Sequence, residues 1–305
     1  MSQERMKAFL AQCRGARIPV KHDLPLCEYS TFRIGGKADL VLFPTTVEQF
    51  TLQLAMLAQS GLKYKVIGNG SNVLFSDVGY RGVIVVTGEM KQYRFDGNVL
   101  VAQSGASLAR VCTEASRQGF EGLEFGCGIP GTVGGGVYMN AGAYGGQISD
   151  VLLFSECYDT ARNCVFTLDT AAHEFAYRHS IFSEHPEYIL LSSRFALQKG
   201  DAEQVMQRVK EQAQARRDKQ PLNYPSVGST FKRPEGYFAG KLIEDAGLKG
   251  TRVGGAVVSE KHAGFVVNEG GATAADVLAL VEQIKERVHA QFGVQLECEF
   301  EYVGE

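Results

Sequence analysis

Residues 126–146 read GCGIPGTVGGGVYMNAGAYGG, and nine of these 21 residues are glycine. Each glycine inside a helix costs about 1 kcal/mol relative to alanine, so we expect no ordinary helix here. Because glycine has no Cβ, the backbone can adopt positive φ and bring its N–H groups close to a ligand. The interspersed Ile129, Pro130, Tyr138 and Asn140 exclude a flexible linker. The segment therefore predicts a shaped ligand-binding loop.

Two other interpretations of this loop are open. Residues 126–131 match the G-x-G-x-x-G dinucleotide fingerprint, which requires a preceding strand and a helix that opens inside the motif. Pro130 removes a backbone donor and the three glycines at 134–136 oppose helix growth, which disfavours this interpretation. A run of tight turns between domains is the simpler alternative, but it leaves the sequence YMNAGAY at 138–144 unexplained.

The bulk composition is that of a soluble globular protein with two or three domains: 305 residues, 45% hydrophobic, 21% charged and a net charge of −3. The sequence has no Lys/Arg-rich run of the kind that predicts nucleic-acid binding. It has no apolar run long enough for membrane insertion, and the N-terminus does not have the pattern of a signal peptide. The cysteines and histidines show no metal-ligand or disulfide spacing, so we expect a cytoplasmic protein without a metal site. We expect Cys127 to be a small core residue.

The predicted helices and strands are mixed without regular alternation, which indicates an α+β fold. We expect a large N-terminal region to about residue 200 and a smaller C-terminal domain from about residue 221, after the break at Pro221–Pro225. Strict alternation over 294–303 predicts a closing strand with one buried face. The other predicted elements are helices at 3–13, 45–60, 107–119, 201–219, 236–246 and 273–291, and strands at 64–67, 83–87, 99–103, 151–158, 164–168, 189–197 and 264–268.

The turn at residues 68–72, Gly-Asn-Gly-Ser-Asn, follows a predicted strand. Successive backbone N–H groups in such a turn can form an anion-binding nest suited to a pyrophosphate. An Asn-Gly turn by itself is more often a hairpin turn. Together with residues 126–146, however, the chain has two phosphate-cradling segments in one region. This pairing favours a large dinucleotide cofactor.

Three further segments have side chains suited to chemistry. Arg178, in the segment YRHSIF at 177–182, can hold a carboxylate through two parallel hydrogen bonds. Ser229 lies in a turn shaped by proline and glycine. Glu297, Glu299 and Glu301 share one face of the predicted closing strand, and their spacing does not say which of them, if any, acts in catalysis. From the residues alone, the alternatives of a surface arginine, a turn serine and a solvated acidic face stay open.

Seven segments resemble the family of UDP-N-acetylenolpyruvoylglucosamine reductases (UDP-N-acetylmuramate dehydrogenases), in its shorter type without the substrate-covering insertion. The resemblance covers nearly the whole chain from STFRIGG at 30–36. Residues 128–135 alone resemble the wider FAD-binding p-cresol methylhydroxylase (vanillyl-alcohol oxidase) type fold. The segments that contain Arg178, Ser229 and Glu299 narrow the resemblance to the reductase family. The segments are GNGSN (68–72), GIPGTVGG (128–135), NAGAYG (140–145), YRHSIF (177–182), GSTFK (228–232), AGKLIE (239–244) and LECE (296–299).

The resemblance implies FAD-binding lobes at residues 1–68 and 69–200, a connecting helix at 201–220 and a C-terminal α+β substrate-binding domain at 221–305. It implies non-covalent FAD, because relatives that link flavin use His or Cys, neither loop contains a histidine, and Cys127 has no such assignment. The implied FAD-binding residues are Gly68, Asn69, Gly70, Ser71, Asn72, Gly128, Ile129, Pro130, Gly131, Thr132, Gly134, Gly135, Asn140, Ala141 and Gly142.

The implied activity is NADPH-dependent reduction of the enolpyruvyl group of UDP-N-acetylglucosamine enolpyruvate to the lactyl ether, which gives UDP-N-acetylmuramate for peptidoglycan synthesis. Hydride passes from N5 of reduced FAD to C3 of the substrate. The resemblance assigns stabilisation of the charge that builds on C2 and its carboxylate to Arg178 with Glu299, and protonation of C2 to Ser229. We expect a cytoplasmic monomer, with no nucleic-acid partner. The candidates for binding the substrate's phosphates or carboxylate are Tyr177, Lys232, Tyr237 and Lys241.

The chain departs from the family's pattern at Gly126-Cys127, at Gly136, where alanine is usual, and at Phe300-Glu301, which replaces the common Val-Arg. These changes affect local packing or charge and leave the three implied catalytic residues in place. One rival function is another FAD oxidoreductase of the same wider fold that acts on an alcohol or phenol. A second is a flavin- or nucleotide-binding protein without catalysis, against which the presence of all three catalytic residues speaks.

Overall fold

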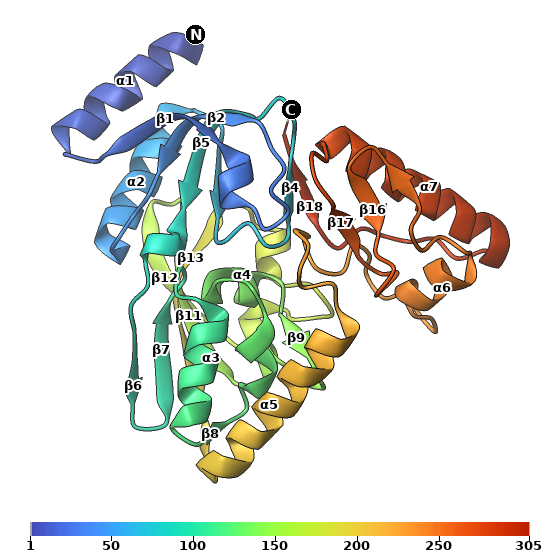
Figure 1. Cartoon of the computed structure of the whole chain (residues 1–305). Coiled ribbons are helices and arrows are strands. Elements are labelled where there is room, and N and C mark those ends of the chain that lie inside the picture. Colours follow the sequence, from blue (N-terminus) through green and yellow to red (C-terminus); the bar gives the residue numbers. More distant parts are fainter. Residues whose placement is uncertain (1, 305) are drawn as a thin grey trace. The chain divides into compact units, whose positions relative to one another are not determined.

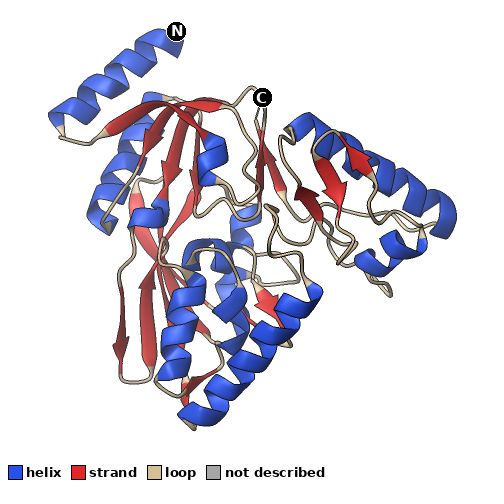
Figure 2. Cartoon of the chain, viewed as in Figure 1, coloured by secondary structure: helices blue, strands red, loops and turns tan. Residues whose placement is uncertain are grey.

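The computed structural model describes residues 2–304, which divide into two units, each assembled from three separate stretches of chain (Figure 1). The first unit comprises residues 2–22, 40–69 and 82–215, and the second comprises 23–39, 70–81 and 216–304. Helices and strands are mixed in both units, which confirms the α+β class (Figure 2). No helix within residues 2–304 combines the length and the apolar character needed to cross a membrane.

A four-stranded sheet has the strand order β1-β2-β5-β3, in which β3 and β5 run parallel. Helix α2 begins after Thr46, whose side chain accepts a hydrogen bond from the N–H of Gln49, and it ends at Gly61 with φ 64°. Phe50 and Leu54 of α2 are fully buried in the core of this region. The elements are α1 (Ser2–Gly15), α2 (Val47–Ser60), β1 (Val20–Pro25), β2 (Lys37–Leu42), β3 (Tyr64–Ile67) and β5 (Tyr80–Val86).

Another sheet, within the first unit, has five antiparallel strands in the order β12-β11-β13-β7-β6. Val111 of α3 and Val137 of α4 pack with strand residues such as Leu100 and Phe195 in one core. Ser107 caps α3, as the sequence predicts. The elements are α3 (Leu108–Arg117), α4 (Val133–Tyr138), β6 (Tyr93–Asp96), β7 (Val99–Gln103), β11 (Leu152–Asp159), β12 (Cys164–Asp169), β13 (Tyr188–Ala196) and the two-stranded pairs β8 (Phe120–Glu121) with β14 (Gln198–Lys199) and β9 (Gly142–Ala143) with β10 (Gly146–Gln147).

Helix α4 shows that the expectation of no helix in the glycine-rich segment is wrong, because its three consecutive glycines lie inside this helix. Thr132 caps the helix, and its hydroxyl accepts the N–H of Gly135 at 3.2 Å. The N–H of Gly134 donates to the carbonyl of Ser104 at 2.7 Å. A Cβ at Gly134 would lie 2.9 Å from the Cβ of Ser104. Close tertiary packing therefore requires glycine here and outweighs its low helix propensity.

We predict opposite effects of alanine at two neighbouring glycines of α4. Gly134→Ala forces its Cβ against Ser104 and should lower the free energy of unfolding by about 1–3 kcal/mol. Gly135→Ala meets only an ordinary contact, 3.6 Å from Thr132 Oγ1, and should be neutral or stabilising by up to about 1 kcal/mol. Urea unfolding of both variants measures the difference. Equal stabilities would contradict the packing argument.

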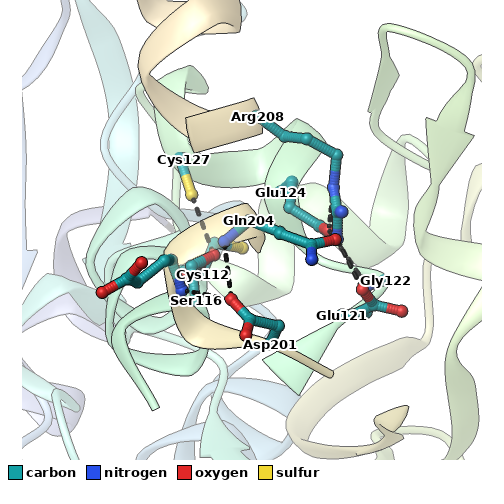
Figure 3. Close-up of polar contacts among 10 residues, drawn as sticks. Cys112, Ser116, Glu121, Gly122, Glu124, Cys127, Asp201, Gln204 and Arg208 are labelled. Carbon is teal, nitrogen blue, oxygen red and sulfur yellow. Dashed lines mark hydrogen bonds and ion pairs between the residues drawn. The ribbon is translucent and has the colours of Figure 1, made fainter. Parts of the chain in front are cut away.

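Helix α5 (Ala202–Lys219) is anchored within the first unit by Arg208. Its Nη2 lies 2.7 Å from Oε1 of Glu121 and 2.7 Å from Oε1 of Glu124 (Figure 3). The other carboxylate oxygen of Glu124 accepts the N–H of Gly122 at 2.7 Å. At the start of α5, the carboxylate of Asp201 accepts N–H groups of the first turn. Side chains of β8 and the turn that follows it thus fix the position of this helix.

The second unit contains a three-stranded antiparallel sheet in the order β15-β16-β17 and two helices, α6 and α7. Thr273 and Asp276 form a capping box at the start of α7, and the N–H of Thr273 lowers the pKa of the Asp276 carboxyl. The elements are α6 (Ala239–Asp245), α7 (Ala274–Phe292), β15 (Arg252–Val253), β16 (Ala256–Val258), β17 (Val266–Asn268) and the parallel pair β4 (Val73–Phe75) with β18 (Glu301–Val303).

The predicted closing strand at 294–303 is largely wrong, because only the last three of these residues form a strand. Before β18 the segment has an irregular backbone with one isolated bridge, between Cys298 and Phe231. Leu296 is buried as expected, but Tyr302 is 42% exposed and Val303 is buried in its place. Apolar and polar residues alternate along this segment although its backbone is irregular before β18. The set of buried positions therefore shifts by one residue where β18 begins.

Candidate active site

The turn at residues 68–72 follows β3 and packs too closely for side chains at two positions. A Cβ at Gly68 would lie 2.4 Å from Thr132 Oγ1. Gly70 has φ 57°, and a Cβ there would lie 2.1 Å from the carbonyl oxygen of Tyr29. No acceptor within residues 2–304 takes the backbone N–H groups of residues 69–71. Three successive donors without acceptors are what a backbone nest offers to an anion.

The start of α4 lies beside this turn but offers few donors of its own. The N–H groups of Val133 and Gly134 donate to the carbonyls of Ala106 and Ser104, at 2.8 and 2.7 Å. The next two N–H groups of α4 donate to the hydroxyl and the carbonyl of Thr132. The glycine-rich segment therefore supplies a surface without side chains, and the turn at 68–72 supplies the unoccupied donors. The unoccupied backbone donors of residues 69–71 suit the pyrophosphate of a dinucleotide.

Arg178 lies in a tight turn of the first unit and is half-buried. Its backbone has φ 55°, which is uncommon for a residue with a side chain. Its Nη2 donates to the carbonyl of Gly142 at 3.4 Å, and its guanidinium carbon lies 5.1 Å from the centre of the Tyr177 ring. The glycine-rich segment and this turn thus meet at the arginine head group.

Asn140 joins the same two segments. Its Nδ2 donates to the carbonyl of Ala176 at 3.2 Å, and its Oδ1 accepts the N–H of Ser149 at 3.0 Å. Ser180, which follows the arginine turn, donates its hydroxyl to the carbonyl of Tyr138 at 2.6 Å. The Asn140 side chain therefore has a structural role at the arginine turn. The predicted role of Asn140 in binding the cofactor stays a prediction.

In the second unit, Ser229 and Glu299 belong to two segments joined by backbone hydrogen bonds. Ser229 is exposed in a loop whose preceding Gly228 has φ 81°. The carbonyl of the next residue, Thr230, accepts the N–H of Glu299 at 2.9 Å. Nδ2 of Asn72 donates to the carbonyl of Glu299 at 3.0 Å. These hydrogen bonds thus hold the segments of Ser229 and Glu299 together with Asn72, at the end of the turn at 68–72.

The four predicted substrate-binding residues differ in what they contact. The Tyr177 and Tyr237 side chains are 54% and 47% exposed. Nζ of Lys232 lies 3.4 Å from the carboxylate of Glu297, and Lys241 pairs with a carboxylate four residues later. The hydrogen bond that Lys241 donates to that carboxylate raises the pKa of the Lys241 ammonium group. Both lysines are therefore paired within the chain, and their roles stay predictions.

Sequence reasoning missed a cation–π pair in the loop that contains Lys232 and Tyr237. The guanidinium carbon of Arg233 lies 3.9 Å from the centre of the Phe238 ring, which is 62% exposed. Nε of Arg233 also donates to the carbonyl of Tyr237 at 3.3 Å. The available signal was an arginine and two aromatic residues within six positions of one loop. Spacing alone does not show that such residues stack.

Cys127 packs against helix α3, in keeping with the expectation of a core residue. Its Sγ lies 3.7 Å from the hydroxyl of Ser116 (Figure 3). Burial raises the pKa of the Cys127 thiol, and it raises that of the neighbouring Cys112 further. Within residues 2–304, no three His, Cys, Asp or Glu side chains gather in a way that could hold a metal ion. The raised pKa of the Cys127 thiol disfavours the thiolate form that a reactive cysteine needs.

We predict that a thiol reagent such as DTNB reacts first with Cys164, which is exposed, and slowly with Cys127 in the native protein. Cys164→Ser should remove the fastest phase of the absorbance change, whereas Cys127→Ser should leave it intact. A fastest phase that disappears with Cys127→Ser would show that this thiol is reactive.

Comparisons with known proteins identify first the class of protein to which the chain belongs and then its family. Residues 38–165 match the family described as "FAD binding domain", so the fold and the site define an FAD-binding protein of mixed α+β structure. Residues 220–303 match the family described as "UDP-N-acetylenolpyruvoylglucosamine reductase, C-terminal domain".

Similar proteins extend these matches to nearly the whole chain. The UDP-N-acetylenolpyruvoylglucosamine reductase of Caldicellulosiruptor bescii is 48% identical over 93% of this chain and 90% of its own length, and that of Clostridium botulinum is 45% identical over 93% and 92%. The crystal structure of the reductase of that name from Thermus caldophilus is 35% identical, covers 93% of this chain and 99% of its own, and superposes with a TM-score of 0.81. The chain belongs to the UDP-N-acetylenolpyruvoylglucosamine reductase family.

We predict that Gly68→Ala weakens FAD binding, because its Cβ would displace the hydroxyl that caps α4. A cost of about 1–3 kcal/mol for overpacking corresponds to a rise in Kd of about fivefold to 150-fold. Gly88→Ala is the matched control, because its Cβ would lie 3.6 Å from the side chain of Asn69, an ordinary contact. Flavin fluorescence titration measures both Kd values. An unchanged Kd for Gly68→Ala would refute the close-approach argument.

Proposed function

We propose that this chain, an FAD-dependent oxidoreductase, uses NADPH to reduce the enolpyruvyl group of UDP-N-acetylglucosamine enolpyruvate to the lactyl ether. The product, UDP-N-acetylmuramate, is a precursor of peptidoglycan, which links the activity to cell-wall biogenesis, cell shape and cell division. One observation carries the proposal: similarity to reductases of this name spans 93% of the chain, across both the FAD-binding and the C-terminal matches.

The residues present fit FAD as the cofactor. The unoccupied N–H groups of the turn at 68–72 suit its pyrophosphate, and the exposed backbone of Gly128 and Gly135 leaves room for close contact. We assign FAD binding to lobes at 1–68 and 69–200, the connection to residues 201–220 and substrate binding to 221–305. The chemistry supplied by bound FAD is the transfer of a hydride from NADPH to C3 of the enolpyruvyl group. No histidine lies in either loop, which supports non-covalent binding.

Arg178 provides the positive charge that the reaction requires. Addition of hydride at C3 builds negative charge on C2 and its carboxylate, and a positioned guanidinium stabilises such charge more than bulk water does. The uncommon backbone conformation of Arg178 and the bond to Gly142 support this role, because both restrict where the head group can lie. We assign Glu299 to the same electrostatic stabilisation.

Ser229 provides the proton for C2. Its position in an exposed turn between buried neighbours supports this role, because the hydroxyl is accessible while Val227 and Thr230 fix the backbone on either side. A serine hydroxyl is a weak acid, so it needs a polar environment to act in this way. Tyr177, Lys232, Tyr237 and Lys241 are proposed contacts for the phosphates or the carboxylate of the substrate.

We place the reaction in the cytoplasm, because NADPH and nucleotide sugars are substrates of cytoplasmic metabolism. We also propose that the monomer is active, because one chain carries Arg178, Ser229 and Glu299 together with both FAD-binding segments.

We predict that Ser229→Ala slows reoxidation of the reduced flavin by the enolpyruvyl substrate by about 10²–10⁴-fold, the usual contribution of a general acid. Reduction of the flavin by NADPH should keep its normal rate, because that step needs no proton at C2. Thr251→Ala, at a half-buried threonine of the second unit outside this loop, is the control and should change neither rate by more than a small factor. Stopped-flow absorbance separates the two half-reactions. A loss in both half-reactions, or in neither, would exclude Ser229 as the acid.

A further inference from the structure

A chain of hydrogen bonds is buried beneath the segment that carries Arg178. Nδ1 of His173 lies 2.6 Å from the carbonyl oxygen of Asp169, and Nε2 lies 3.0 Å from the hydroxyl of Ser155. The hydroxyl of Ser155 lies 2.9 Å from that of Ser193, its cross-strand partner on β13. His173, Ser155 and Ser193 are each at most 1% exposed. No sequence motif indicates a role for these three residues.

The direction of every bond in this chain follows from its first acceptor. A carbonyl oxygen can only accept, so Nδ1 of His173 carries the hydrogen and Nε2 is the acceptor. Ser155 must then donate to Nε2, and its own oxygen accepts the hydroxyl hydrogen of Ser193. Burial lowers the pKa of His173, which favours this neutral ring. The bonds fix the ring in one tautomer and one orientation over β11 and β13.

The fixed ring contacts both ends of the segment that carries Arg178. On one side it stacks on Phe175, with ring centres 4.9 Å apart and planes 17° apart. On the other side it meets the edge of Phe182, with centres 5.8 Å apart. Residues 176–179 form the turn between these two phenylalanines, and an isolated bridge pairs Ala176 with His179. A shift of the imidazole would therefore reach the turn from both sides.

We propose that His173, held by Ser155 and Ser193, is a positioning residue for Arg178. The aromatic contacts set the path of residues 175–182, and the hydrogen bonds set the imidazole against which they pack. The inference rests on the role proposed above for Arg178. It predicts a defect confined to the step in which Arg178 stabilises charge.

The test uses His173→Phe in the FAD-loaded enzyme. Phenylalanine keeps a ring of similar size but removes both hydrogen bonds, so the ring loses its fixed orientation. A displacement of about 1 Å in a positioned group can cost about 10²-fold in rate. We expect reoxidation of reduced flavin by the enolpyruvyl substrate to slow by about tenfold or more, with an unchanged rate of reduction by NADPH. A fall in kcat with little change in KM should accompany this.

Two serine variants and a double variant complete the test. Ser155→Ala removes the donor to Nε2 and should slow the same half-reaction, which keeps the test decisive if His173→Phe folds poorly. Ser192→Ala is the control. This buried serine of β13 donates to Glu156 and takes no part in the hydrogen bonds that hold His173. It should leave both half-reactions unchanged. In an Arg178→Ala background, His173→Phe should cause no further slowing, because both changes remove the same interaction.

Four results would overturn the inference. Slowing by His173→Phe that multiplies with that of Arg178→Ala would show independent effects. Equal losses in both half-reactions, together with a lower Tm, would indicate a purely structural residue. Normal reoxidation in both His173→Phe and Ser155→Ala, with slow reoxidation in Arg178→Ala, would remove the role of His173 and leave that of Arg178. Normal reoxidation in Arg178→Ala itself would overturn the proposed role of Arg178 and the inference with it.

Discussion

Thr132 has room for its hydroxyl only because Gly68 carries no side chain. That hydroxyl caps α4, and the first N–H groups of α4 in turn bond to the carbonyls of Ser104 and Ala106. The turn after β3, the start of α4 and the segment after β7 are therefore held in one arrangement by close backbone approach. Larger residues at Gly68 or Gly134 would force these segments apart. The exposed backbone surface proposed for FAD depends on this constraint.

Backbone conformation positions the proposed catalytic groups as much as side-chain contacts do. Arg178 and Asn140 both adopt positive φ, which costs about 1–3 kcal/mol for residues with a side chain and persists only where the surroundings enforce it. Around Arg178, the bonds of Asn140 and the stacked ring of His173 supply that enforcement. The backbone of Glu299 is held by the bonds from its N–H to Thr230 and from Asn72 to its carbonyl. Residues outside the chemistry thus determine where the reactive atoms lie.

The sequence predicts well what depends on local rules. The helices predicted at 107–119 and 273–291 begin within a residue of the observed α3 and α7, because the side-chain oxygens of Ser107 and Thr273 each accept an N–H group of the first turn. Helix α4 escapes prediction because Gly134 is required by its close contact with Ser104, far away in sequence. The segment at 294–300 escapes because alternation records burial and not strand pairing. A lone histidine such as His173 gives no signal until the fold packs it against Phe175 and Phe182, on either side of the turn that carries Arg178.

The candidate site, like the fold, can be predicted from the sequence only in part. The family resemblance names Arg178, Ser229 and Glu299 because they lie in recognisable motifs, and the whole-chain similarity confirms the family. It does not reveal that Asn140 also supports the arginine turn, or that both candidate lysines already pair with carboxylates. Such contacts depend on rotamers and on neighbours brought together by folding.

The central claim is that the bound flavin passes hydride from NADPH to an enolpyruvyl nucleotide sugar. Anaerobic stopped-flow absorbance of the purified FAD-loaded protein tests it most directly. NADPH should bleach the visible absorbance of the oxidised flavin, and UDP-N-acetylglucosamine enolpyruvate should restore it rapidly, with UDP-N-acetylmuramate as the product. UDP-N-acetylglucosamine, which lacks the enolpyruvyl group, should leave the flavin reduced. Reduced flavin that stays bleached with the enolpyruvyl substrate, or that recovers equally with both sugars, would contradict the account.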